Sequence, residues 1–251
     1  MAKKKNDSLL LPLVVGLLFA CAFAFFYLNS ASTPVNPVTG CAATPQQSSS
    51  ALSILLDSTE PYSPIQMARV TDRILEKVSE LEPLDRVRIY KVDDVSNGLL
   101  QPYFDFCKPD PNAKNSSPIV ARFKQANFAF MLEENLKEMQ GTRSNSPIIS
   151  SISSIAVDLP KSFENRSIVL VSDLIENSDL ISMYDSNWRK ELVLAQRRLN
   201  AKRPMLNGIT LEVLFIPRPN QPQQDTALRD WWWQFIEESG GRISRFTPVS
   251  G

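Results

Sequence analysis

The sequence predicts an α/β fold, in which a three-layer, doubly wound, mostly parallel sheet follows an N-terminal transmembrane helix. From Ser53 onward, short apolar runs alternate with amphipathic segments. Two of the runs, 54–56 and 168–171, are uninterrupted, as is typical of strands that helices cover on both faces. Strands that alternate with helices imply crossover connections between parallel neighbours. A separate stretch of about 20 uncharged residues near the N-terminus is long enough to cross a bilayer.

The stretch near the N-terminus, residues 9–28, contains no charged residue and follows Lys3, Lys4 and Lys5. A cleavable signal peptide has a shorter apolar region and a small-residue cleavage site, which residues 30–32 match poorly, so we expect a retained anchor. By the positive-inside rule, the basic tail 1–8 stays in the cytoplasm. The remainder of the chain is then exported, and its globular domain is periplasmic or extracellular.

Residues 29–51 are rich in Ser, Thr, Pro, Ala and Gln, a composition typical of a flexible linker. The globular domain is expected to cover 52–251. Its strands are predicted where apolar or alternating runs lie between turn residues. They are expected at 54–57, 86–92, 103–107, 168–173, 209–217 and 243–247, with the third and the last at sheet edges.

Helices are predicted where apolar residues recur at helical spacing. The first begins at Ser63 and Pro64, since a hydroxyl cap followed by a first-turn proline is typical of a helix start. The other helices are expected at 119–139, 147–157, 187–200 and 227–238, with a polar loop at 141–146.

Composition excludes several classes of protein. Histidine is absent, which removes Ser-His-Asp and Cys-His catalysis and His-ligated zinc. Lys plus Arg and Asp plus Glu both number 27, so net charge gives no indication of a nucleic-acid partner. The 8 glycines form neither a dinucleotide-binding fingerprint nor a phosphate-binding loop, so no nucleotide is expected.

The most informative residues are Asp57 and Asp173, each of which ends an uninterrupted apolar run. Ligands of parallel sheets bind beyond the carboxyl ends of the strands. Two carboxylates delivered there, the first followed by hydroxyl residues, predict a site for a hard cation or a polar ligand. The alternative is that Asp57 caps the following helix and Asp173 only begins a loop.

The order of elements and the two aspartates together resemble the von Willebrand factor A-type domain, a Rossmann-like fold, over about residues 53–250. In that family a D-x-S-x-S motif, a threonine of a second loop and an aspartate of a third loop hold Mg²⁺ or Mn²⁺. This metal-ion-dependent adhesion site accepts a carboxylate from a protein partner. The resemblance therefore implies adhesion or assembly, with magnesium or manganese as cofactor.

Carried over by residue, the resemblance assigns Asp57 to the motif's aspartate and Thr59 to its first hydroxyl. Pro61 occupies the second hydroxyl position, which Ser63 would fill if the loop bends. Asp173 matches the third-loop aspartate. The second-loop hydroxyl is open among three residues, Thr142, Ser144 and Ser146. Because Mg²⁺ keeps several waters, two carboxylates and a hydroxyl can suffice.

Three further features complete the expectations. Glu176 and Asn177 add polar groups to the rim beside Asp173. In the final helix Trp233 falls away from the apolar stripe, so it is a candidate for partner contact. Cys41 and Cys107 would both face an oxidising compartment and could form a disulfide, or else be two unrelated thiols.

Three functions follow from these observations. The first is a single-pass membrane protein that presents a protein-binding module outside the cytoplasmic membrane, for adhesion or for assembly of an envelope complex. The second is a magnesium-dependent phosphoester hydrolase that uses Asp57 and Asp173, although no nucleophile with a base is visible. The third is a metal-free structural subunit whose tryptophan helix is the interface. The protein partner is not named by the sequence.

Overall fold

In a computed structural model, the described residues are 15–23, 35–42, 49–93, 98–111, 117–138, 141, 144–185 and 187–251. Six strands form one sheet in the order β3-β2-β1-β4-β5-β6. All neighbours are parallel except β2 and β3, which are antiparallel. The mostly parallel α/β fold is thus confirmed. The strands are β1 (Ser50–Leu56), β2 (Arg86–Lys91), β3 (Phe104–Cys107), β4 (Asn165–Ser172), β5 (Ile209–Phe215) and β6 (Arg242–Pro248).

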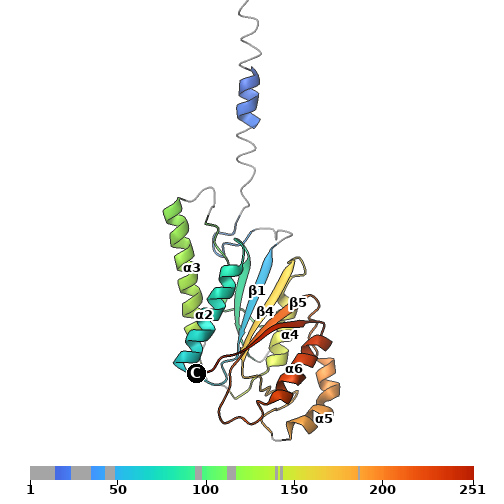
Figure 1. Cartoon of the computed structure of the whole chain (residues 1–251). Coiled ribbons are helices and arrows are strands. Elements are labelled where there is room, and N and C mark those ends of the chain that lie inside the picture. The colour runs from blue at the N-terminus through green and yellow to red at the C-terminus, as the bar shows by residue number, and fades with distance from the viewer. Residues whose placement is uncertain are drawn as a thin grey trace, which may run out of the picture.

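Helices cover both faces of the sheet (Figure 1). One apolar core lies under α2 and α3, and the second lies under α4, α5 and α6. The sheet is therefore the middle of three layers. The helices are α2 (Pro64–Glu80), α3 (Pro118–Glu138), α4 (Ile148–Asp158), α5 (Trp188–Ala201) and α6 (Thr226–Glu238).

The two uninterrupted apolar runs are the central strands β1 and β4. Successive side chains of a strand point to opposite faces. Ile54 and Leu56 accordingly pack beneath α2 and α3, while Leu55 packs beneath the helices of the other face. Both faces of a central strand need apolar side chains, which explains why polar alternation is missing from these runs.

At the N-terminus, residues 15–23 are helical. Within the described part of the chain, no helix combines the length and the apolar character needed to cross a bilayer. Residues 9–14 and 24–28 of the expected anchor lie outside the described residues, as do residues 29–34 and 43–48 of the expected linker.

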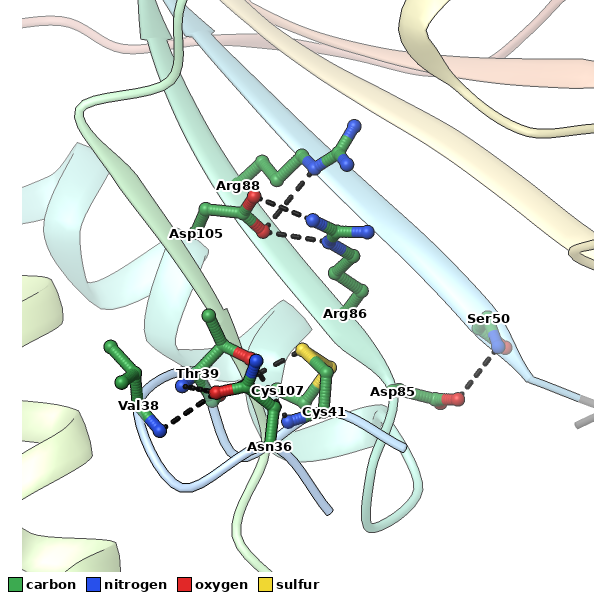
Figure 2. Close-up of a disulfide and its surroundings, with 10 residues drawn as sticks. All are labelled: Asn36, Val38, Thr39, Cys41, Ser50, Asp85, Arg86, Arg88, Asp105 and Cys107. Carbon is green, nitrogen blue, oxygen red and sulfur yellow. Dashed lines mark hydrogen bonds and ion pairs between the residues drawn. A yellow bond between two sulfur atoms is a disulfide. The ribbon is translucent and has the colours of Figure 1, made fainter. Parts of the chain in front are cut away.

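Cys41 and Cys107 form a disulfide (Figure 2). Cys107 ends β3 and pairs with Arg86, the first residue of the antiparallel neighbour β2. The backbone N–H of Cys107 also donates to the carbonyl of Thr39 at 2.9 Å. Residues 35–42 are therefore fastened to the edge of the sheet at which the parallel strands begin.

Loss of this disulfide should destabilise the domain. The bond joins residues 66 apart, and the chain-entropy model gives about 4 kcal/mol for a loop of that size. We expect the Cys41→Ser/Cys107→Ser double variant to lose roughly that free energy of unfolding in urea titration. Cys21→Ser is the control, because Cys21 is free and exposed. Equal midpoints for the double variant and the parent protein would contradict the prediction.

Candidate functional site

Asp57 and Asp173 directly follow the neighbouring strands β1 and β4. Leu56 is in register with Val171, and the backbone N–H of Asp57 donates to the carbonyl of Val171 at 2.9 Å. Both aspartates are buried. The parallel register thus brings two carboxylates from distant parts of the sequence to adjacent strand ends.

Three hydroxyl groups donate hydrogen bonds to the carboxylate of Asp57. Thr59 Oγ1 donates to Oδ1 at 2.8 Å. Ser146 Oγ and Ser172 Oγ donate to Oδ2 at 3.0 and 2.7 Å. These bonds replace the hydrogen bonds to water that a buried carboxylate loses. Asp57 is therefore the centre of a polar cluster that β1, β4 and the segment before α4 build together.

Of the two second-loop candidates that the structure describes, Ser144 and Ser146, it is Ser146 whose hydroxyl reaches Asp57. Ser144 is exposed, and its backbone carbonyl accepts a hydrogen bond from Asn177 Nδ2 at 2.7 Å. Thr142 lies outside the described residues. The sequence left this choice open because the spacing of a loop does not fix which hydroxyl turns inward.

The carboxylate of Asp173 accepts fewer hydrogen bonds than the carboxylate of Asp57. Its Oδ1 accepts the backbone N–H of Ile175 at 2.9 Å. Its buried Oδ2 has no hydrogen-bond partner among the described residues. Burial, followed by the nearby charge of Asp57, raises the pKa of Asp173 to about 7. The site therefore contains one satisfied carboxylate and one whose negative charge is poorly compensated.

Arg218 lies within ion-pair distance of that oxygen, with its Nε 3.7 Å from Asp173 Oδ2. The guanidinium donates to the backbone carbonyls of Pro61 and Glu60 at 2.8 and 3.2 Å. It also forms an ion pair with Glu60 Oε2 at 3.3 Å. Arg218, which follows β5, thus contributes positive charge to the site while it ties down the loop after β1.

Ser63, the predicted second hydroxyl, instead caps α2. Its Oγ accepts the backbone N–H of Gln66 at 3.1 Å, and Gln66 Oε1 accepts the N–H of Ser63 at 2.9 Å. This reciprocal capping box satisfies backbone donors at the start of the helix. Tyr62, just before it, donates from its hydroxyl to the backbone carbonyl of Asp57.

Glu176 requires a correction, because the sequence places it on a partner-binding rim and the structure buries it completely. Its Oε2 accepts the N–H of Ile149 at 3.0 Å, and its Oε1 accepts from Ser178 Oγ at 2.6 Å. Burial raises the pKa of Glu176 to about 8. From this position it holds the first turn of α4 and does not face a partner.

Asn177 is half-buried and joins the second and third loops. Its backbone exchanges hydrogen bonds with Ser146 in both directions, at 2.8 and 3.0 Å. Together with the side-chain bond to Ser144, these contacts hold Ser146 beside β4. Asn177 therefore supports the polar cluster from outside it.

The tryptophans of α6 divide between core and surface. Trp232 is buried, and its Nε1 donates to the carbonyl of Leu174 at 2.8 Å. Leu174 has a positive φ of 65°, which is uncommon for a non-glycine residue. Trp233 is 37% exposed, and its Nε1 donates to Glu237 on its own helix at 2.8 Å. Trp232 thus stabilises the loop after Asp173, whereas Trp233 faces outward.

Sequence reasoning missed Ser172 and Arg218. Ser172 lies inside the predicted strand 168–173, which gives it no role in the site, although its Oγ donates to Asp57 and accepts the N–H of Leu174 at 2.8 Å. Arg218 stands three residues beyond the end of β5. The rule that located the aspartates, that parallel strands deliver residues to one common edge, could have found both.

The donor set partly fits a divalent cation. Over the described ranges, no three residues of the types His, Cys, Asp or Glu gather in a way that could hold a metal. A cation would need the two aspartates supplemented by hydroxyls and water, as Mg²⁺ accepts. The buried Oδ2 of Asp173, which has no hydrogen-bond partner among the described residues, is available as an oxygen ligand for such a cation.

Comparisons with known proteins give no family. No protein-family model matches the sequence, and the search of curated proteins found no match. Among solved structures, proximal thread matrix protein 1 from the mussel byssus (crystal form 2) is similar with a TM-score of 0.42 and 9% identity. The match covers 81% of this chain and 42% of the mussel chain, so this chain spans less than half the length of that protein. A likeness of this strength carries no argument about function.

The raised pKa of Asp173 predicts a pH dependence of stability. The folded state binds this proton more tightly than the unfolded state, whose carboxyl has a pKa near 3.8. The free energy of unfolding should therefore fall as pH rises from about 4 to about 7, by up to about 1.4 kcal/mol per pH unit. Urea titrations in chelator across this range should show a shallower slope for Asp173→Asn. An unchanged slope would mean that Asp173 titrates normally.

Proposed function

We propose that this chain is a single-pass membrane protein that presents a von Willebrand A-like protein-binding module outside the cytoplasmic membrane. It would serve adhesion or the assembly of an envelope complex. The binding site is the polar cluster at the carboxyl ends of β1 and β4, and the ligand is a protein partner that binds through a Mg²⁺ or Mn²⁺ ion.

The observation that carries this proposal is the buried, unpartnered Oδ2 of Asp173 beside Asp57. A buried polar atom without a partner costs free energy, and more so when it is charged. Arg218 Nε lies near this oxygen at 3.7 Å without a hydrogen bond. A divalent cation would compensate both aspartates at once.

The residues that would hold the ion are Asp57, Thr59, Ser146 and Asp173. Ser63 is not among them, since its hydroxyl is engaged at the start of α2. When bound, the ion supplies a coordination position that a partner's carboxylate can occupy. The protein's own part is to orient the carboxylates, which the hydroxyls around Asp57 already do.

The position of the disulfide supports an anchored module. It fastens residues 35–42 where the parallel strands begin, whereas the aspartates lie where they end. A partner can thus approach the site from the side of the domain opposite residues 35–42, the segment that follows the expected anchor in the chain. Structural disulfides are also typical of exported domains.

Thermal unfolding of the full chain with Mg²⁺, Mn²⁺ or chelator tests the ion site. A ligand that binds only the folded state stabilises it by about 2.7 kcal/mol at 100 times its dissociation constant. We expect millimolar Mg²⁺ to raise the unfolding temperature of the parent protein and to leave Asp57→Asn unchanged.

Asp85→Asn is the matched control for this experiment. Asp85 is also a buried aspartate, but it accepts the N–H of Ser50 at 2.6 Å, at the start of β1. This variant should lose stability yet keep the response to Mg²⁺. No response in the parent protein would favour the metal-free structural subunit, and magnesium-dependent hydrolysis of a phosphoester would favour the hydrolase.

Arg218→Gln should strengthen metal binding. The substitution removes a positive charge that lies within ion-pair distance of Asp173 and Glu60. We expect a lower unfolding temperature in chelator and an affinity for Mg²⁺ higher on the order of tenfold, a change of about 1.4 kcal/mol. Arg203→Gln is the control, since Arg203 pairs with Glu238 at 2.7 Å on α6. Weaker metal binding by Arg218→Gln than by this control would contradict the proposed competition.

A further inference from the structure

Helix α3 has apolar side chains on two opposite faces. The inner face packs against the sheet, where Leu132 and Leu136 are fully buried and Phe128 contacts Phe104 edge-on with ring centroids 5.6 Å apart. The outer face is lined by four residues spaced four, three and four apart, which places them on one side of a helix. We call them the α3 stripe: Ile119, Phe123, Ala126 and Phe130.

The α3 stripe is exposed to solvent. Ile119, Phe123 and Phe130 are 81%, 70% and 61% exposed, and Ala126 between them is exposed as well. Single exposed apolar residues are ordinary, but a continuous apolar surface marks an interaction site. The fold itself does not need these side chains, because the opposite face of α3 already supplies its contacts with the core.

Charge distinguishes the segment that carries the stripe. Residues 118–132 contain Arg122 and Lys124, both exposed, and no acidic residue. Acidic residues follow only in the last two turns, where Lys137 forms ion pairs with Glu133 and Glu134 at 2.9 and 3.2 Å. Exposed aromatic and aliphatic side chains flanked by basic residues are typical of a helix that binds an anionic lipid surface.

The position of α3 in the domain also favours contact with a lipid surface. Its last turns, with Glu133 and Lys137, line a groove with Pro64 and Met67 at the start of α2, next to the strand ends that carry the site. Its first turn lies at the other end, where residues 35–42 are fastened to Cys107 (Figure 1). Residues 35–42 turn back on themselves, with Val35 bridged to Ala42, so the chain between the expected anchor and this turn is residues 29–34, which can reach at most about 20 Å.

We propose that the α3 stripe docks on the anionic surface of the bilayer that holds the chain's own anchor. This inference rests on the membrane topology in the proposed function, and not on the ion site. A second copy of the chain fits less well, because the stripe offers on the order of 500 Å² against roughly 800 Å² that each partner buries in a stable interface. A tethered bilayer needs less area, because the tether keeps its effective concentration high.

The test uses the full chain with Cys21→Ser, reconstituted into vesicles and labelled with an environment-sensitive fluorophore at Ala126→Cys. Val193→Cys on α5 is the matched control, since Val193 is 71% exposed and lies in the helix layer on the opposite side of the sheet from α3. Quenchers attached to lipid acyl chains report contact with the bilayer. We expect several-fold stronger quenching at position 126 than at 193 when phosphatidylglycerol is present, and weaker quenching with phosphatidylcholine alone.

The Phe123→Ser/Phe130→Ser variant should lose this quenching and keep its circular dichroism spectrum, because both rings are exposed. Quenching at position 126 no stronger than at 193 would overturn the docking. Oxidative cross-linking of the unlabelled Ala126→Cys variant into a dimer, together with no quenching of the labelled protein, would identify a second copy as the occupant and overturn it too. Extraction of the chain by alkaline carbonate would contradict the anchor itself, and the docking with it.

Discussion

The organisation of the candidate site depends on one constraint, the burial of the Asp57 carboxylate at the end of β1. A buried carboxylate must be hydrogen-bonded, and Asp57 obtains its donors from three separate segments. Thr59 follows it in the chain, Ser146 precedes α4, and Ser172 ends β4. Each hydroxyl fixes the backbone that carries it, so the loops around the site are ordered by the same interactions that satisfy the charge.

The buried carboxylate of Asp173, unlike that of Asp57, does not have enough hydrogen-bond donors to compensate for its burial. Its partner groups are one backbone N–H and a guanidinium that is only within ion-pair distance. Proteins retain such costly arrangements chiefly at functional sites. The contrast between two carboxylates on neighbouring strands, one satisfied and one not, is a stronger indication of a binding site than the presence of two aspartates alone.

The domain also has two distinct ends. The disulfide fastens the N-terminal segment where the parallel strands begin, and the polar cluster lies where they end. Helix α3 runs between these ends, apolar and basic near the first and rich in ion pairs near the second. This polarity separates the surface proposed for a lipid bilayer from the surface proposed for a protein partner.

Sequence alone determined the alternation of elements, the burial of β1 and β4 on both faces, and the two aspartates at their ends. These features are local, since burial on both faces leaves an unbroken apolar run in the sequence itself. Tertiary structure decided which hydroxyl reaches Asp57, that Glu176 is buried, and that Arg218 joins the site from β5. Those outcomes depend on how loops distant in the sequence meet at one edge of the sheet, which no local pattern records.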